Sequence, residues 1–330
     1  MKIYFKLMAF FSFLSRPSRY ILLKMETSTV AYITLKALNE SRTNRYVIFA
    51  FSLQGYIFTL FLNLTIIITV LLEKDLHQPM YIFLCNLCIN GLYGTVGFYP
   101  KFLSDLFSDT YLISYSGCLL QTFVIFSYAL CEFTNLTVMA IDRYVAICRP
   151  LHYSTVMTPV TICKLLIFIW MVPFFSILCS IILNITLPYC GLYVSTLYCK
   201  ITISTCKQDS VRFAFNGTFG SMYLLMATFV IYSYGKIISA CRKSKENRAK
   251  FMQTCLPHLI SCINYVFITF LDGFSGTNFP QWFSGFISVA FLVNPPIINP
   301  IIYGINLRSI RRKVCKCCKR RQVLECGFTF

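Results

Sequence analysis

The sequence predicts an all-α membrane protein: a seven-transmembrane helix bundle with a short amphipathic helix after the seventh span. The first reason is composition, because 57% of the 330 residues are hydrophobic and 13% are charged, whereas a soluble domain carries about 25% charged residues. The second is that seven apolar stretches are each long enough to cross a bilayer, which takes about 20 residues. The third is that basic residues cluster in every second connection between these apolar stretches, as they do on the inner side of a membrane.

The expected spans differ in polarity. The second span holds Asn86 and Asn90, which suits a helix that faces the interior of a bundle. The seventh is interrupted by Pro295, Pro296 and Pro300, and a span tolerates proline because neighbouring helices satisfy the freed backbone carbonyls. The expected spans are residues 46–72, 79–105, 115–148, 160–183, 212–242, 248–275 and 281–304.

The distribution of lysine and arginine predicts how the bundle is inserted. Arg143, Arg149, the basic run 242–250 and the basic cluster 308–321 fall on one side, which we expect to be cytoplasmic. The net charge of +18 is then explained by the anionic inner leaflet of the bilayer, and we expect no nucleic acid as a partner. The chain is expected to be a multi-pass protein of the plasma membrane. It divides into an extracellular tail (1–45), a transmembrane domain (46–304) and a cytoplasmic amphipathic helix with a tail (305–330).

Two motifs lie at the cytoplasmic ends of expected spans. Asp142, Arg143 and Tyr144 end the third span, and two charges at the edge of the hydrocarbon are costly unless they pair or reach the interface. In the seventh span, Pro300 removes a backbone hydrogen bond, and Tyr303 lies on nearly the same helix face. Taken alone, these motifs are also explained by a capped helix end and by a proline-kinked span.

One longer run indicates a family. Residues 139–153 read Met-Ala-Ile-Asp-Arg-Tyr-Val-Ala-Ile-Cys-Arg-Pro-Leu-His-Tyr and closely resemble the third helix of vertebrate, fish-like olfactory receptors, which are rhodopsin-like G-protein-coupled receptors. The runs 76–81 and 255–259 resemble further olfactory-receptor signatures, and the resemblance covers about residues 25–315. It implies a receptor that binds a small odorant, activates a stimulatory heterotrimeric G protein and raises cyclic AMP. It implies no enzymatic activity and no cofactor.

Two other classes of membrane protein fit the sequence less well. A channel or transporter usually shows inverted repeats or charged residues at the midplane of several spans, and only Glu132 meets that description. A peptide, lipid or amine receptor of the same superfamily is disfavoured by the runs that contain His77 and His258.

The resemblance assigns roles to the two motifs. The arginine of the first motif would couple to the G protein, and the aspartate before it would restrain it in the resting state. The tyrosine of the seventh span would swing inward on activation and bridge through water to a tyrosine of the fifth span. The expected coupling and switch residues are Asp142, Arg143, Tyr144, Tyr234, Asn299, Pro300 and Tyr303.

The resemblance also implies a ligand pocket in the outer halves of the third, fifth and sixth spans. Amine receptors place an aspartate where Ile125 stands, so an amine salt bridge is not expected at that position. Plain helix packing is the alternative role for each pocket residue. The expected pocket residues are Ile125, Phe126, Ala129, Leu130, Thr218, Met222, Tyr265 and Phe267.

Glu132 is a carboxylate in the middle of the third span, where it should face the bundle interior and have a partner. Related receptors hold a sodium ion near this place, but olfactory receptors usually have an aspartate where this chain has Gly91. A sodium site is one alternative, and a protonated glutamate bonded to Asn63 or Asn299 is the other. Asn90 is expected to face elsewhere, and no other metal site is expected.

Four cysteines on the expected outer side should form disulfides, because that side is oxidising. Four cysteines allow three connectivities. The resemblance selects Cys118–Cys199, with Cys190–Cys206 as a second bridge inside the loop.

Other modifications are expected near the two ends of the chain. Asn39 heads a glycosylation sequon in the outer tail. Cys315, Cys317 and Cys318 lie in a basic segment beside the membrane, which favours acylation over metal binding. Residues 1–24 have the basic start and short apolar patch of a weak signal peptide. From Met25 the chain resembles the usual short olfactory-receptor N-terminus, and we favour a disordered extension without function for the residues before it.

A chain that starts at Met25 should reach the cell surface as well as the full chain. Surface labelling of an epitope tag, compared with total expression, measures this. A large loss of surface labelling would instead show that residues 1–24 are a targeting signal.

Overall fold

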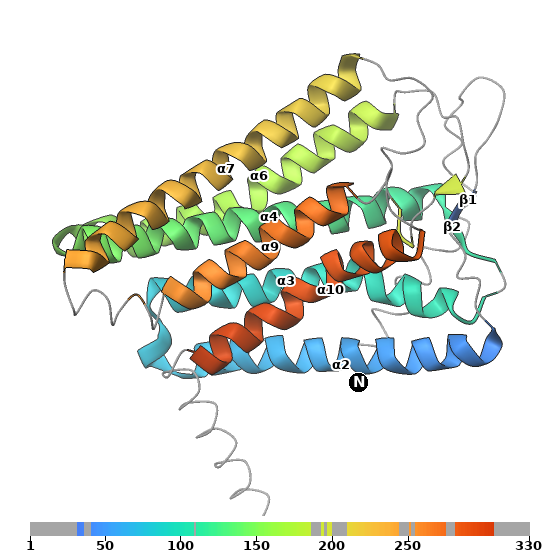
Figure 1. Ribbon diagram of the computed structural model, residues 1–330, viewed down its shortest axis with the longest axis horizontal. Helices are drawn as coiled ribbons and strands as arrows, with labels where there is room; N and C mark the ends of the chain where they lie inside the picture. Colours follow the sequence, from blue (N-terminus) through green and yellow to red (C-terminus); the bar gives the residue numbers. More distant parts are fainter. Residues whose placement is uncertain are drawn as a thin grey trace, which may run out of the picture.

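Seven long helices lie side by side in the part of the chain that the computed structural model describes (Figure 1). This part comprises residues 32–35, 41–108, 110–185, 193–194, 197–199, 210–243, 251, 255–274 and 281–306. Short elements join some helices, namely η1 (Lys74–Leu76), η2 (Pro150–His152) and α5 (Tyr153–Val156). The long helices are α2 (Arg42–Leu72), α3 (Pro79–Asp105), α4 (Tyr115–Cys148), α6 (Pro159–Ile185), α7 (Ser210–Lys243), α9 (Leu256–Phe274) and α10 (Gln281–Asn306).

The helices follow the spans expected from the sequence, and the helical membrane bundle is confirmed. Among the described residues, six helices are long and apolar enough to cross a membrane, and a shorter apolar helix runs over Leu256–Asp272. α9 begins at Leu256, and the expected start at 248 lies outside the described residues. Pro257 lies in its first turn, where a missing N–H costs little, so a helix start here is favoured. The amphipathic helix expected after the seventh span lies outside the described residues.

α4 occupies the centre of the bundle. It contacts α3, α6, α7 and α9, and 89% of its most apolar window is buried, against 39% in α2 and 28% in α6. The peripheral helices carry large exposed apolar side chains, which would promote association in water but suit contact with lipid. Examples are Phe51, Phe61, Phe175, Leu225 and Ile231.

Local sequence explains where three helices begin. The Ser41 hydroxyl accepts a hydrogen bond from the Asn44 backbone N–H at the start of α2, over 3.3 Å. Ser114 accepts from the Gly117 backbone N–H at the start of α4, over 3.1 Å. Both serines satisfy N–H groups that have no partner inside a helix. Pro79 opens α3, where its fixed φ angle is already helical.

A small sheet lies at one end of the bundle, which we call the Cys118 end; the opposite end is the Arg143 end (Figure 1). The strand order is β2-β1-β3. The central strand β1 (Tyr32–Leu35) is antiparallel to β2 (Leu112–Ser114) and parallel to β3 (Tyr193–Val194). Only a tail was expected at residues 32–35, because so short a strand has no periodic signal that could be recognised.

One face of the sheet is part of a separate apolar cluster. Ile33 and Leu35 are 3% and 1% exposed, whereas Tyr32 on the opposite face is 38% exposed. The buried pair packs with Tyr111, Ile113 and the Cys118–Cys199 disulfide. The strand therefore ties the chain before α2 to two loops and to the start of α4.

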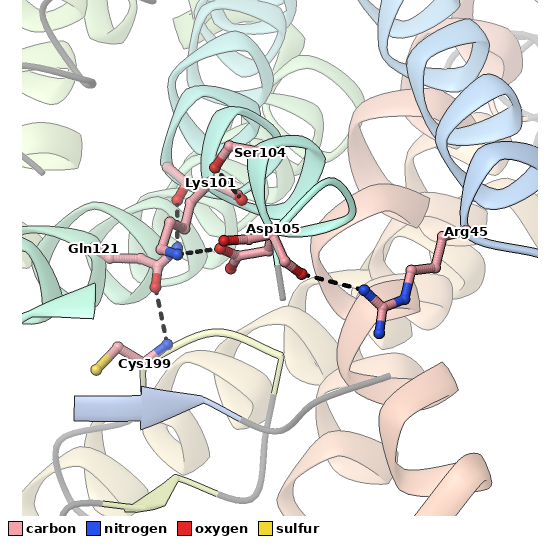
Figure 2. Close-up of polar contacts among 8 residues, drawn as sticks. Arg45, Lys101, Ser104, Asp105, Gln121 and Cys199 are labelled. Atoms are coloured by element: carbon pink, nitrogen blue, oxygen red, sulfur yellow. Dashed lines mark hydrogen bonds and ion pairs between the residues drawn. The ribbon is translucent and has the colours of Figure 1, made fainter. Parts of the chain in front are cut away.

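Figure 2 shows the polar contacts that hold the loops at the Cys118 end. The Gln121 side chain on α4 donates to the Gly97 carbonyl oxygen on α3 at 3.1 Å, and its oxygen accepts from the Cys199 backbone N–H at 3.0 Å. On the far side of α3, the Arg45 guanidinium donates to the Ser108 carbonyl oxygen at 3.2 Å. Side chains of two helices thus replace missing backbone partners of irregular loop segments.

The interior between the helices contains two further apolar clusters. One extends from the middle of the bundle to the Arg143 end and includes Leu130, Leu136 and Tyr234. The other lies toward the Cys118 end and includes Ile125 and Tyr198. α4 contributes to both clusters, so a shift of this helix would change the packing of each.

Replacing Ile33 with aspartate should destabilise the protein, because it places a carboxylate inside the apolar cluster of the sheet. We expect the free energy of unfolding to fall by roughly 2 kcal/mol or more, with a lower thermal midpoint of the purified protein in detergent. Tyr32→Asp on the exposed face is the matched control and should change little. Equal midpoints for the two variants would show that the strand does not contribute to stability.

Candidate functional site

A charged pair lies at the Arg143 end of α4. The Arg143 Nε donates to Asp142 Oδ2 at 2.9 Å, and both side chains are buried. The Tyr153 hydroxyl on α5 donates to Asp142 Oδ1 at 2.7 Å, so each carboxylate oxygen has a donor. Burial raises the pKa of the Tyr153 phenol above its usual range, and the charge of Asp142 adds to this effect, so the phenol remains a donor.

The third residue of this motif lies apart from the pair. Tyr144 is half-buried, and its ring is 6.0 Å from the Arg149 guanidinium. The second partner of the aspartate, beside Arg143, is Tyr153, which sequence reasoning missed. The residue stands at the end of the 139–153 run, but only the fold of η2 and α5 brings it back to Asp142.

A second polar contact joins three helices near the charged pair. His258 Nε2 donates to the Leu136 carbonyl oxygen on α4 at 3.0 Å. Its Nδ1 then accepts from the Tyr234 hydroxyl on α7, and the two rings are nearly parallel with centroids 5.7 Å apart. One ring nitrogen donates and the other accepts, so the geometry fits a neutral imidazole. We call this set of bonds the His258 contact.

Glu132 is held by two amides in the middle of the bundle. Its Oε1 accepts from Asn299 Nδ2 on α10 at 2.6 Å, and its Oε2 accepts from Asn90 Nδ2 on α3 at 2.7 Å. The expectation that Asn90 faces elsewhere was wrong. One residue is about 100° of helix rotation, and this turns Asn90 toward α4 while Gly91 faces α2 and α10. The amide of Asn63 donates to the Pro296 carbonyl oxygen instead, at 2.8 Å.

Of the two alternatives for Glu132, the structure shows the bond to Asn299. In this arrangement both carboxylate oxygens of Glu132 face amide nitrogens rather than oxygen ligands. A Cβ at Gly91 would come within 3.3 Å of both Asn63 Oδ1 and Pro296 Cβ, so the place of the missing aspartate is occupied. The described residues also contain no group of three or more His, Cys, Asp or Glu side chains that could hold a metal ion.

The tyrosine of the seventh-helix motif is buried without a polar partner. Tyr303 is fully buried, and its hydroxyl has no hydrogen-bond partner among the described residues. Pro300 is buried one turn earlier on α10. The hydroxyl of Tyr234, the expected partner on activation, is engaged in the His258 contact here.

The expected pocket residues are divided between the two interior clusters. Ile125 and Ala129 are buried toward the Cys118 end, with Phe126 half-buried beside them. Leu130 and Tyr265 belong to the other cluster, against which Met222 packs. The Tyr265 hydroxyl donates to the Ala129 carbonyl oxygen at 2.5 Å. The side chain of Thr218 lies outside the described residues, although its backbone is part of α7.

Phe267 does not belong to this set. Its side chain is 60% exposed on the outer surface of α9, so its proposed place in the pocket was wrong. Positions 265 and 268 are buried while 266 and 267 are exposed, which is the spacing of a helix with one interior face.

Cys118 and Cys199 form a disulfide with their Cα atoms 5.4 Å apart. The bridge holds the loop segment 197–199 against the start of α4, and Tyr198 beside it is fully buried in the cluster that contains Ile125. The remaining expected modification sites lie outside the described residues, namely Cys190, Cys206, Asn39, Cys315, Cys317 and Cys318.

Comparison with known proteins settles the family. The family model described as "Olfactory receptor" matches residues 51–321. The chain belongs to the olfactory receptor family. Human olfactory receptor 4M1 is 32% identical over 315 residues, which cover 88% of this chain and 96% of that receptor. Mouse olfactory receptor 2C1 is 34% identical over 277 residues, which cover 80% of this chain and 88% of that receptor.

Membership makes the chain an odorant receptor of the G-protein-coupled class and a multi-pass membrane protein, not an enzyme. A further relative, human olfactory receptor 4E1, is 30% identical over 91% of this chain and 97% of its own length. These relatives are mammalian and give no support to the fish-like character suggested by the sequence.

Glu132→Gln should lower the thermal midpoint of the purified receptor. Glutamine offers one acceptor oxygen in place of two, so either Asn90 or Asn299 loses its acceptor. A buried donor without a partner costs about 1–3 kcal/mol. Sodium chloride should stabilise the wild-type receptor no more than choline chloride at equal ionic strength. A sodium-specific rise that disappears in the variant would contradict the amide-bonded arrangement.

Proposed function

We propose that this receptor binds a small odorant toward the Cys118 end and activates a stimulatory heterotrimeric G protein at the Arg143 end, which raises cyclic AMP. The observation that carries the proposal is the His258 contact beside the buried Asp142–Arg143 pair. Together they form a resting arrangement in which Arg143 is buried and α9 is bonded to both α4 and α7. Few hydrogen bonds maintain this arrangement, so a ligand can reverse it.

The proposed orientation places the Cys118 end outside the cell and the Arg143 end in the cytoplasm. The disulfide supports this, because such bridges persist in oxidising compartments. The basic residues Lys74, Arg149 and Arg242 adjoin helix ends on the Arg143 side, where anionic lipid attracts positive charge. The N-terminus is then extracellular, the C-terminus is cytoplasmic and the receptor resides in the plasma membrane.

The proposed ligand site is the apolar interior toward the Cys118 end. Ile125, Phe126 and Ala129 lie in or beside the cluster that Tyr198 enters from the loop, and such apolar surroundings suit small odorants. Deeper contacts are proposed for Leu130, Met222 and Tyr265, where the Tyr265 hydroxyl reaches α4. Thr218 completes the set by its position on α7.

Activation is proposed to be a shift between two populations. A ligand that binds the active arrangement more tightly displaces the equilibrium by the difference in its two affinities. α9 moves away from α4, the bond from His258 to the Leu136 carbonyl breaks, and Arg143 leaves Asp142. The guanidinium is always charged, and its planar donor fork can bind carbonyls or a carboxylate of the G protein.

The buried hydroxyl of Tyr303 supports a partner exchange in that step. A buried hydroxyl without a hydrogen bond costs free energy in the resting arrangement. When the His258 contact breaks, Tyr234 also loses a partner. The hydroxyls of Tyr234 and Tyr303 can then form hydrogen bonds to a shared water. Asn299 and Pro300 lie where the missing proline N–H weakens α10, which allows Tyr303 to move.

Further proposals concern residues outside the described part of the chain. They are a Cys190–Cys206 bridge, glycosylation of Asn39, and a basic amphipathic helix held on the inner leaflet by acyl chains on Cys315, Cys317 or Cys318. The bridge rests on the resemblance to the family, and the other two rest on the sequence pattern. Tyr144 is proposed to contribute to the G-protein surface through its contact with Arg149.

Arg143→Ala should abolish the cyclic-AMP response to a panel of odorants in cells while leaving surface expression largely intact. The reason is that the guanidinium is the proposed contact with the G protein. Tyr153→Phe removes one hydrogen bond from Asp142 but keeps Arg143, so it is the matched control and should retain the response. A full response in Arg143→Ala would refute the coupling role.

A further inference from the structure

Three polar side chains from three elements meet near the Cys118 end. The Ser288 hydroxyl on α10 donates to Asp272 Oδ1 on α9 at 3.0 Å. Tyr198 comes from the disulfide-held loop and is fully buried. Burial raises the pKa of its phenol well above the usual range, and the negative charge of Asp272 adds to this effect.

Helix periodicity places this group directly beside the proposed odorant site. Ile268 lies one turn before Asp272 on α9, and Phe291 lies three residues after Ser288 on α10. Both are buried in the same apolar cluster as Ile125 and Tyr198. Residues three or four apart share a helix face, so the carboxylate and the serine lie on the faces that turn toward this cluster.

A purely structural tie between α9 and α10 does not require a charge at this place. A neutral acceptor would bond Ser288 without the cost of partly desolvating a carboxylate. Another carboxylate of the described helices at this end, Asp105, forms an ion pair with Lys101 on its own helix (Figure 2). Asp105 is buried, whereas Asp272 is half-buried and lies one turn from Ile268 of the cluster that contains Ile125 and Tyr198.

We propose that Asp272 is the anchor for a protonated amine, so that the receptor responds to small organic amines with an apolar body. The ammonium group donates to the Asp272 carboxylate, the Tyr198 ring lies over the charge, and the apolar body packs toward Ile125 and Phe291. Charge-assisted hydrogen bonds and contact with an aromatic face are the interactions that favour ammonium groups. Asp272 on α9 would thus provide the acid that amine receptors place at the Ile125 position of α4. This inference rests on the proposed odorant function.

The test uses the full receptor in cells with a cyclic-AMP reporter. The probes are hexylamine and phenethylamine, with hexanol and phenethyl alcohol as neutral counterparts. In Asp272→Asn, which keeps the shape and an acceptor for Ser288, the potency of the amines should fall by about tenfold or more. The potency of any active alcohol should stay within about threefold, as expected when no charge is recognised.

Ser288→Ala is the matched control, because it removes the hydrogen bond and keeps the charge. The amine response should survive in this variant. If both variants lose surface expression and respond equally weakly to amines and alcohols, Asp272 is a structural tie and the inference is wrong. If alcohols activate the wild-type receptor and amines do not, the inference fails while the proposed function stands.

A binding measurement separates the inference from signalling. Hexylamine and phenethylamine should raise the thermal midpoint of the purified wild-type receptor and should not do so for Asp272→Asn. If neither amine shifts the wild-type midpoint, the inference is overturned whatever the reporter shows. If the midpoint shifts but no cyclic AMP follows, the amine site stands and the proposed G-protein coupling fails.

Discussion

The burial of α4 among its neighbours is the constraint on which the rest of the structure depends. A polar group that is removed from both water and lipid headgroups must find a partner inside the protein. Asn135 on α4 therefore donates to the Phe83 carbonyl oxygen on α3 at 3.0 Å. Glu132 accepts from two other helices, and Asp142 holds Arg143. The partners of Asn135 and Glu132, which lie on α3 and α10, set the register of the bundle.

The two ends of the bundle are held by interactions of different strength. At the Cys118 end, a covalent bridge, a sheet and the Gln121 side chain fix the loops to α3 and α4. At the Arg143 end, the His258 side chain on α9 bonds to the Leu136 carbonyl oxygen of α4 and to Tyr234 of α7, among the residues that the structure describes. A movement that begins at the Cys118 end is therefore most easily followed by a rearrangement of helices at the Arg143 end, where no covalent bridge or sheet holds the described helices together.

Sequence reasoning succeeded where the signal is local. Hydropathy located the spans because each one is continuous, and Asp142 and Arg143 could be paired because they are adjacent. It failed where the fold brings distant segments together, as with Tyr153 on Asp142 and Tyr198 near Asp272. It also failed for the direction of Asn90, because one residue of helix rotation separates an interior contact from a different one. Contacts between distant segments and the rotation of a helix about its axis both depend on the whole fold, so a local stretch of sequence does not predict them.

The central position of β1 has a consequence for biogenesis. Its partner strands follow much later in the chain, with Tyr193 of β3 opposite Thr34. Segment 32–35 leaves the ribosome long before β3 and cannot complete its hydrogen bonds until the fourth long helix, α6, has been made. Contacts of such large sequence separation form slowly. Until then the chain presents an unpaired strand edge, which other chains can pair with.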